Sequence, residues 1–598
     1  MIGSTNISIN RYYNYKIAIF LISIFSFSLM TFHLYVSEAT QNDNQSIFVP
    51  YNETITENST KNTNFTNTSV ELTILSDTLE IKLNKLSSLL EITSTLPQII
   101  NFPMEEFIDK KLNGIPENFD VYKRKLAKDI LVKYDDFSLI GFILPNGNVY
   151  MQEPFERQKN LTTGNLGFRD YFKTTLNTGK TYLSDVIVSK SSGRSLTVMA
   201  TPVFSNNQII GVLYGTLDLN IFNELLQSFA LPSNYRILIV DKAGIKLGDS
   251  DKSKVPSFSN RTFEEANKFS YLDAFNNALK GESGFTKEKV DNKTAIISYI
   301  PYKTLQNVRI LLVMQECSDL QNYTENENKF SCENIENKII KGSPLIDKNF
   351  LVNLLSLNLK EYLQVAEILL DITSKLPQIS ENINPNLINS TVHGINSFDG
   401  LEKRQVAKSI LSKTNLFESV FLLLNNGDMY LDEPYQRQEN LSRDNFVIRD
   451  YYKGVKNSNS TSLGNAIVSS ATGKNQPNIA VPVFSENMTL SGIWAGGLNL
   501  TTISKIIQNF NLTNENDLIL YLDENGVDVG ISDRKILEKI TGNQIFDFSK
   551  LRSFIDASNG NTGSTTDTIL GKEYEIAYSP VKIIDKTWVV LFIRDVVS

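Results

Sequence analysis

Apolar residues recur at helical spacing in two separate stretches of the chain. The first stripe consists of Leu75, Leu79, Leu83, Leu86 and Leu90. The second consists of Leu355, Leu359, Leu363, Ala366 and Leu370. Spacings of three and four place such side chains on one face of a helix, so each stretch predicts a long amphipathic helix. Leu-Pro-Gln follows each stripe, and proline disfavours helical backbone in the residue before it, so both helices should end there.

A stripe of this kind is typical of a helix face packed against the rest of a domain. It also fits a seam along which two helices pair. We treat a side-by-side pairing of the two helices as a hypothesis, which a structure with the helices far apart would exclude.

Apolar runs separated by turn residues predict antiparallel hairpins after each helix. The turns are Asn146-Gly147, Asn426-Gly427, Asp241 to Gly244 and Asp523 to Gly526. Paired runs then close the sheets, such as 194–204 with 209–219 and 294–300 with 308–314. We therefore expect an α+β fold with four small antiparallel sheets, two after each long helix.

The two halves of the chain repeat one another, which indicates two large modules and not a solenoid. Matching positions include Leu96 with Leu376, Glu153-Pro154 with Glu433-Pro434, Arg169 with Arg449 and Pro202 with Pro482. We place the first module at 70–315, a linker at 316–347 and the second module at 348–598. The larger sheet domain of each module should span about 115–222 and 395–502, and the smaller one about 230–315 and 513–598.

The run from Ile17 to Val36 contains no charged residue and follows Arg11 and Lys16. About 20 apolar residues match the hydrocarbon thickness of a bilayer, and the basic flank favours a cytoplasmic N-terminus. Residues 1–38 are thus predicted to be a cytoplasmic tip and a transmembrane helix. A cleaved signal peptide, cut after Ala39, is the alternative. Either interpretation exports the rest of the chain.

The residues after this run fit an extracellular location. Residues 39–69 are rich in Asn, Thr and Ser and predict a flexible stalk. Glycosylation acceptors are frequent: Asn52, Asn58, Asn64, Asn67, Asn160, Asn260, Asn322, Asn389, Asn440 and Asn511. Outside the cell, Cys317 and Cys332 should form one disulfide between the modules; a pair of free thiols is the alternative.

The composition argues against nucleic-acid binding, catalysis and metal binding. The 598 residues are 41% hydrophobic and 21% charged, with a net charge of −8, so no basic stripe for nucleic acid is expected. The only histidines are His33 and His393, and neither a nucleophile–base pair nor metal-ligand spacing is evident. We expect no enzyme, no metal and no cofactor. The segment from Asp523 to Asp528 suggests a calcium loop but lacks its later glutamate, so a hairpin turn is favoured.

The order of motifs resembles the double-Cache family of extracellular sensors. These motifs are Arg-Asp-Tyr-Phe at 169–172, Gly-Lys-Thr-Tyr-Leu-Ser-Asp-Val at 179–186, Ala-Thr-Pro-Val-Phe at 200–204 and Gly-Val-Leu-Tyr-Gly-Thr-Leu-Asp-Leu at 211–219. The resemblance covers almost all of both modules. It implies a long helix in each module that carries a membrane-distal and a membrane-proximal PAS-like domain. It also implies a small-molecule ligand, often an amino acid or a carboxylate, in the distal domain.

The resemblance and the chemistry of the side chains together suggest ligand-binding residues in the first module. Arg169 has a rigid fork suited to a carboxylate, and Tyr171 with Phe172 would form an apolar wall. The resemblance implies that the ligand's amine meets groups equivalent to Tyr182, Asp185 and Asp218. The competing interpretation of this motif is an internal ion pair with aromatic packing.

The second module keeps Arg449 and Tyr451 but has Ser462, Asn465 and Asn499 where the first has Tyr182, Asp185 and Asp218. An ammonium group would lose both anionic partners. We therefore predict that this module does not bind α-amino acids, and binds either a carboxylate without an amine or nothing.

These observations predict a sensor of small extracellular molecules at the cell membrane, with most of the chain outside the cell. No output domain is expected after Ser598, so a signalling partner in the membrane is expected to relay the signal. The alternative is a glycosylated surface or adhesion protein that uses the fold structurally.

Overall fold

The computed structural model describes residues 70–100, 105–134, 136–229, 231–254, 268–318, 331–340, 348–485, 487–508, 512 and 516–596. The predicted membrane segment 17–36 and the stalk 39–69 lie outside these ranges. Within the ranges, no helix combines the length and the apolar character needed to span a bilayer. Residues 63–411 and 415–598 belong to one compact unit, and the architecture below is that of this unit.

Both predicted long helices are present, as α2 (Val70–Ser94) and α11 (Lys348–Ser374). Both end at the predicted place. Leu376 has extended backbone, with φ −69° and ψ 139°. The proline that stops each helix then opens a short new one, α3 (Pro97–Ile100) and α12 (Pro377–Ser380), because its fixed φ suits a first helical position.

The predicted antiparallel sheets of the first module are confirmed. Sheet 1 has the strand order β2-β1-β6-β5-β3, with β4 also paired to β5. Its strands are β1 (Phe137–Ile143), β2 (Val149–Glu153), β3 (Tyr182–Leu183), β4 (Ile187–Val188), β5 (Ser195–Ser205) and β6 (Gln208–Asp218). Sheet 2 has the order β8-β7-β11-β10-β9. Its strands are β7 (Tyr235–Asp241), β8 (Lys246–Asp249), β9 (Gly284–Val290), β10 (Lys293–Thr304) and β11 (Asn307–Glu316).

The second module repeats this topology. Sheet 3 has the order β13-β12-β18-β17-β14, and sheet 4 the order β20-β19-β23-β22-β21. The strands of sheet 3 are β12 (Phe417–Leu424), β13 (Met429–Glu433), β14 (Ser462–Leu463), β17 (Asn478–Phe484) and β18 (Leu490–Leu498). Those of sheet 4 are β19 (Leu518–Leu522), β20 (Asp528–Ile531), β21 (Gly563–Ile569), β22 (Lys572–Ile583) and β23 (Lys586–Asp595). A separate pair is formed by β15 (Ile467–Val468) and β16 (Asn475–Gln476).

Successive side chains of a strand point to opposite faces of the sheet, and both faces of sheet 1 are buried. Met199 of β5 and Leu213 of β6 belong to the core that contains the leucines of α2. Val198 and Tyr214, one residue away on each strand, instead pack with Tyr171 and Phe172 of α6 (Asp170–Thr178). Sheet 1 therefore lies between the long helix and a layer of short helices.

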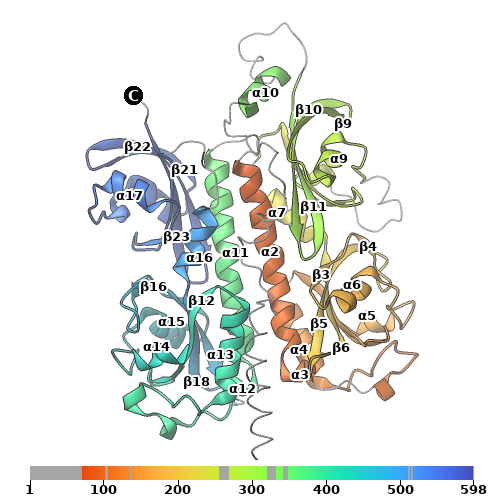
Figure 1. Ribbon diagram of the computed structural model, residues 1–598, viewed down its shortest axis with the longest axis vertical. Helices are drawn as coiled ribbons and strands as arrows, with labels where there is room; N and C mark the ends of the chain where they lie inside the picture. Colours follow the sequence, from red (N-terminus) through yellow and green to blue (C-terminus); the bar gives the residue numbers. More distant parts are fainter. Residues whose placement is uncertain are drawn as a thin grey trace, which may run out of the picture. The chain divides into compact units, whose positions relative to one another are not determined.

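Short helices complete the modules (Figure 1). In the first module they are α4 (Val121–Lys133), α5 (Phe155–Lys159), α6, α7 (Asn220–Gln227) and α9 (Asp273–Leu279). In the second they are α13 (Leu401–Lys413), α14 (Tyr435–Glu439), α15 (Asp450–Ser458), α16 (Leu500–Gln508), α17 (Arg534–Thr541) and α18 (Arg552–Ser558). Between the modules, Cys317 and Cys332 form a disulfide with a Cα–Cα distance of 5.0 Å. It joins the end of β11 to α10 (Cys332–Ile340).

The two long helices pack side by side (Figure 1), as the pairing hypothesis requires. Lys85 Nζ of α2 lies 3.2 Å from Glu361 Oε2 of α11 and donates to Gln364 Oε1 at 3.0 Å. Burial by itself would lower the pKa of Lys82, but Glu361 and Asp136 together raise it above its usual value. The first module thus contributes the cations of this contact, and the second contributes the carboxylate of Glu361.

Replacing Glu361 by glutamine should lower the unfolding free energy by about 1–2 kcal/mol. Lys85 would lose its buried ion pair with Glu361, but it would keep Asp136 at 3.8 Å and the hydrogen bond to Gln364. Denaturant unfolding of the full chain measures the change. The matched control is Glu316→Gln, whose partner Lys293 is exposed on 63% of its side chain. That exposed pair should be worth less than about 1 kcal/mol. Equal effects of the two substitutions would contradict the prediction.

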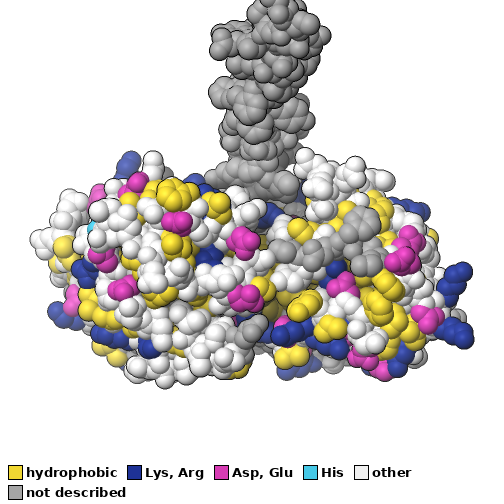
Figure 2. Space-filling view, turned by 90° about the horizontal axis from the view of Figure 1, so that it is seen from below, with side chains coloured by type: hydrophobic (Ala, Val, Ile, Leu, Met, Phe, Trp, Pro, Cys, Tyr) yellow, Lys and Arg dark blue, Asp and Glu magenta, His cyan; other side chains and the backbone are white. Residues whose placement is uncertain are grey.

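On the face drawn in Figure 2, acidic and basic side chains are interspersed without a broad area of either sign. Nucleic-acid-binding surfaces gather lysine and arginine on one face. This face does not have that character.

Candidate functional site

The face of sheet 1 beneath α6 brings together most of the residues that the sequence suggested as ligand contacts. Arg169 is the residue before the first turn of α6 and has extended backbone. It is half-buried, and its Nη2 donates to the carbonyl oxygen of Val188 at 2.8 Å. Its guanidinium carbon lies 5.2 Å from the centre of the Phe168 ring. These contacts leave other N–H donors of the fork for a ligand.

Tyr171 and Phe172 form the apolar side of this face. They are 3% and 4% exposed, respectively. The ring of Tyr171 stacks with that of Tyr214, with centroids 5.8 Å apart. Burial raises the pKa of Tyr171, and the nearby charge of Arg169 acts in the opposite direction. The phenol and the guanidinium therefore lie close enough to interact.

Asp218 ends β6 and lies on the same face as Tyr214, because residues two apart on a strand point the same way. Arg157 of α5 lies close to both. Burial lowers the pKa of Arg157, as does Arg194, while Tyr214 and Asp218 oppose the shift. Its Nε donates to Ser191 Oγ at 2.9 Å. The charge of Arg157 thus acts on both Tyr214 and Asp218, and that of Arg169 acts on both phenols.

Sequence reasoning missed Arg157, Tyr214 and Gln152. Gln152 is 2% exposed and its Nε2 donates to the hydroxyl of Tyr214. The signal for Arg157 was available, since Arg437 repeats it at the same place after Glu-Pro. The partner of Gln152 lies on a strand distant in sequence, and the sequence alone could not identify it.

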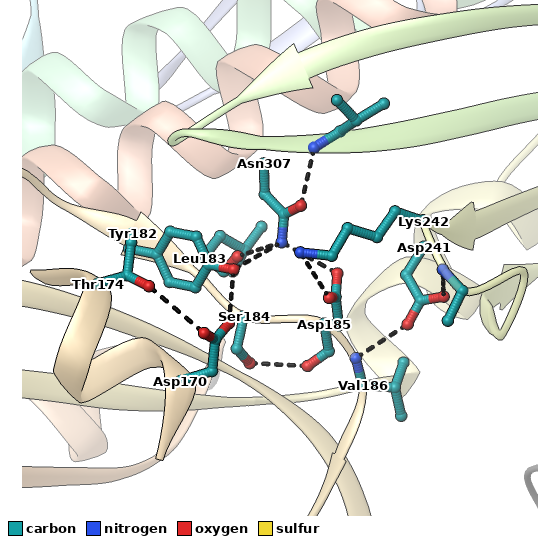
Figure 3. Close-up of polar contacts among 12 residues, drawn as sticks. Asp170, Thr174, Tyr182, Leu183, Ser184, Asp185, Val186, Asp241, Lys242 and Asn307 are labelled. Atoms are coloured by element: carbon teal, nitrogen blue, oxygen red, sulfur yellow. Dashed lines mark hydrogen bonds and ion pairs between the residues drawn. The ribbon is translucent and has the colours of Figure 1, made fainter. Parts of the chain in front are cut away.

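Tyr182 and Asp185 lie at the junction between sheets 1 and 2 (Figure 3). Tyr182 donates its hydroxyl to Asp170 Oδ2 at 2.8 Å. Asn307, in the β10–β11 hairpin, donates Nδ2 to the hydroxyl of Tyr182 at 3.3 Å and to Asp185 Oδ1 at 3.0 Å. Burial is the main cause that raises the pKa of Tyr182, and its bond to Asp170 adds to it.

Asp185 is also paired with two cations of the smaller sheet. Its Oδ1 lies 3.2 Å from Arg309 Nη1, and its Oδ2 lies 3.1 Å from Lys242 Nζ. The structure therefore places Asp185 in a bridge to sheet 2, whereas Asp218 lies on the α6 face of sheet 1 at the end of β6. A direct ligand contact for Asp185 stays a prediction, which would require this bridge to open.

The second module has the same junction with other side chains. Asn465, at the position of Asp185, donates Nδ2 to Glu524 Oε1 at 2.8 Å. Ser462 donates its hydroxyl to Asp585 Oδ2 at 2.7 Å. In both modules the residue after this position donates its backbone N–H to an aspartate of the smaller sheet. Val186 donates to Asp241 in the first module, and Ala466 donates to Asp523 in the second. Contact between the sheets is thus kept although the charges differ.

Arg449 and Tyr451 occupy the same places as Arg169 and Tyr171. Arg449 Nη2 donates to the carbonyl oxygen of Val468 at 3.1 Å. Tyr451 is 2% exposed, and its ring lies 6.1 Å from that of Phe421. Asp523 Oδ1 accepts the N–H groups of Asn525 and Val527, so this segment forms the expected hairpin turn. Among the residues described, no cluster of histidine, cysteine, aspartate or glutamate side chains has a geometry that could hold a metal.

A family model for the Cache domain matches residues 52–320 and 340–597. The chain belongs to the Cache-domain family. The two matches correspond to its two modules, which are tandem Cache modules. Membership supports a role in sensing a small molecule.

Solved Cache structures similar to this chain include bacterial chemoreceptor domains. One is the ligand-binding domain of Pseudomonas fluorescens CtaA with L-isoleucine, at 15% identity, a TM-score of 0.30, and coverage of 46% of this chain and 97% of that one. Another is the ligand-binding domain of Pseudomonas aeruginosa PctB with L-Arg, at 14% identity and a TM-score of 0.30, with coverage of 41% of this chain and 85% of that one. A third is that of PctC from the same species with GABA, at 16% identity and a TM-score of 0.29, with coverage of 41% of this chain and 96% of that one. No curated protein matches the sequence.

Proposed function

We propose that the first Cache module binds a small molecule through a carboxylate held by Arg169, and that the chain acts as a sensor at the cell surface. The single observation that carries the proposal is that the charge of Arg169 acts on both buried phenols of this sheet face, Tyr171 and Tyr214, beside its hydrogen bond to Val188. Residues 17–36 would anchor the chain in the membrane and place both modules outside the cell.

Charges of both signs in this region favour a zwitterionic ligand. Arg169 offers donors in a planar fork that matches a carboxylate. Asp218 is half-buried and lies near the cation Arg157, and it would accept the ammonium group of the same ligand. Amino acids are therefore the first class of probe to test, with simple carboxylates second.

The junction between the sheets offers a route from this site to the smaller domain. Asp170 follows Arg169 in sequence and accepts the hydroxyl of Tyr182. Tyr182 in turn accepts from Asn307 of sheet 2. A ligand that draws Arg169 toward its carboxylate would move the start of α6, and this chain of hydrogen bonds would carry the displacement to the β10–β11 hairpin.

A thermal-shift screen of the full chain with amino acids and carboxylates, followed by calorimetric titration of the best probe, tests the proposal. Arg169→Ala should weaken binding roughly 10- to 100-fold, since a hydrogen bond to a charged group is worth about 1.5–3 kcal/mol. Arg449→Ala is the matched control, because it removes the equivalent contact to Val468 and leaves the first module intact.

Normal affinity in Arg169→Ala would exclude the proposed role of this arginine. If no amino acid or carboxylate stabilises the wild-type chain, the alternative of a surface or adhesion protein that uses the Cache fold structurally is favoured.

A further inference from the structure

The contact between the two long helices contains a cluster of four charged side chains. Lys82 and Lys85 of α2 lie 3.3 and 3.8 Å from the carboxylate of Asp136, which lies between α4 and β1. The same two lysines lie 3.6 and 3.2 Å from the carboxylate of Glu361 on α11. The four side chains are between 6% and 15% exposed. Two largely buried cations thus meet two carboxylates, and only Glu361 comes from the second module.

The duplicate has an uncharged residue at every position that matches this cluster, 280 positions away. These residues are Tyr362 for Lys82, Val365 for Lys85, Leu416 for Asp136 and Ile81 for Glu361. They meet as their counterparts do. The hydroxyl of Tyr362 donates to the carbonyl oxygen of Leu416 at 3.5 Å, and Leu416 packs against the buried group that contains Val365. The matching place in the second module is therefore apolar.

The apolar stripes do not distinguish one long helix from the other. Leu79 and Leu83 of α2 match Leu359 and Leu363 of α11, and all four are at most 1% exposed. A helix with such a stripe can also pair with its own copy in another molecule. The charged cluster, in contrast, differs between the two modules at each of its positions.

Pairing of either helix with its own copy in the same geometry would leave charges unbalanced. Two α2 helices would replace Glu361 by the uncharged Ile81, so both lysines would share the single carboxylate of Asp136. Two α11 helices would leave Glu361 among uncharged side chains, without a cation. A buried charge that has lost its partner is strongly unfavourable, and a symmetric pair would contain this defect twice. Only the pairing of α2 with α11 balances the charges.

We propose that this cluster selects the partner of the first module: it fits the second module of the same chain and excludes a second copy of either long helix. The face of α2 is thus an interaction surface for an unlike partner, and the protein carries that partner itself. The inference does not depend on ligand binding in either module.

A charge exchange across the contact tests this selection in the full chain, purified in detergent. Glu361→Lys leaves three cations with one carboxylate, and Lys85→Glu leaves one cation with three carboxylates. Each substitution should lower the melting temperature by about 5 °C or more. The double variant again has two charges of each sign, so it should recover at least about half of that loss.

Co-expression of the two single variants with different affinity tags tests which partner is chosen. Within either variant the charges are unbalanced, but an exchange of modules between the two chains balances them at both contacts. Capture of one tag should therefore retain the other chain severalfold more than when both chains carry the same variant. Two wild-type chains, or two chains with both substitutions, should not retain one another.

The matched control exchanges the charges of an exposed pair in the smaller sheet of the first module. Lys293 and Glu316 lie 2.7 Å apart, and their side chains are 63% and 45% exposed. Lys293→Glu co-expressed with Glu316→Lys should give no capture, because an exposed charge needs no partner. If Lys85→Glu does not accumulate, Lys82→Glu replaces it, since Lys82 contacts the same two carboxylates.

Three results would overturn this assignment. The first is that two wild-type chains retain one another. The second is that the double variant melts no higher than the single variants. The third is that the two different single variants retain one another no better than identical variants do. The last two would show that the charges stabilise the contact without selecting the partner.

Discussion

Replacing Arg124 by methionine is expected to lower the unfolding free energy by about 3–5 kcal/mol, the range found when one partner of a buried ion pair is removed. Arg124 is 2% exposed. Its Nη1 lies 2.6 Å from Glu153 Oε1, and its Nη2 donates to the carbonyl oxygen of Ile115 at 2.8 Å and to Gln158 Oε1 at 3.1 Å. Methionine fills a similar volume but supplies none of these donors, so the buried carboxylate of Glu153 would keep only the half-exposed Lys128, whose Nζ lies 3.8 Å from Glu153 Oε2.

The duplicate permits an independent repeat of the measurement. Arg404 is 1% exposed and makes the same contacts with Glu433, Ile395 and Gln438. Arg404→Met should therefore destabilise the second module by a similar amount. Urea unfolding of the full chain, with the first transition compared between variants, measures both effects.

Lys128→Met is the control for a charge that is not buried. Lys128 is exposed on 49% of its side chain and lies 3.3 Å from Glu117 and 3.8 Å from Glu153. Because its charge stays in contact with water, its loss should cost less than about 1 kcal/mol even though it shares Glu153 with Arg124. An Arg124→Met variant as stable as the Lys128→Met variant would show that the buried pair does not hold the module together. Adding Glu153→Met to Arg124→Met should restore part of the lost stability, because the buried carboxylate that lost its main partner is then removed as well.

The second large effect is a gain in stability on replacing Asp432 by asparagine, and it should depend on pH. Burial raises the pKa of Asp432 from 3.8 to about 7; the neighbouring Glu433 adds to the shift, and Arg437 and Arg404 oppose it. Between these values the folded state holds a proton that the unfolded state has lost. Stability of the wild type therefore falls as pH rises from about 4 to about 7.

Asparagine does not titrate, so Asp432→Asn removes this penalty. The variant should exceed the wild type by on the order of 2–4 kcal/mol at pH 8, since each unit of pKa shift corresponds to about 1.4 kcal/mol. The advantage should shrink toward zero near pH 4. Unfolding free energies of both proteins at pH 4.5, 6 and 8 measure the trend. A difference that is the same at all three values would show that Asp432 is not a buried titrating group.

Several features of the site followed from local sequence. Successive residues of β6 alternate between the α2 face and the α6 face, so Tyr214 and Asp218 of the motif that ends this strand could be assigned to one side of a sheet. Arg169 before an aromatic pair predicted a cation beside an apolar wall. In the structure its charge acts on the phenol of Tyr171, and the ligand contact of this group stays a prediction. These relations depend only on neighbours along the chain.

Other features depend on residues that meet only in the folded protein. Asp185 appeared to be a ligand contact in the sequence, but Arg309 and Lys242, more than fifty positions later, bind its carboxylate. Gly141 lies opposite Tyr214 in the first module, and Phe421 lies opposite Ala495 in the second. Each pair contains one aromatic ring, but the ring comes from a different strand, because packing constrains the volume at this place and not the strand that fills it. An alignment of the two halves shows only that both positions differ.

The sequence by itself determined the duplication, the two long helices, the hairpins and the antiparallel sheets, because these arise from periodicity and turn chemistry within short stretches. Only the tertiary structure decided which charges are paired. Lys85 meets Glu361, Asp185 meets Arg309, and Asp432 Oδ1 has no hydrogen-bond partner within the described part of the chain. The physical reason is that the energy of a buried charge is set by the groups around it in space, and those groups come from distant parts of the chain.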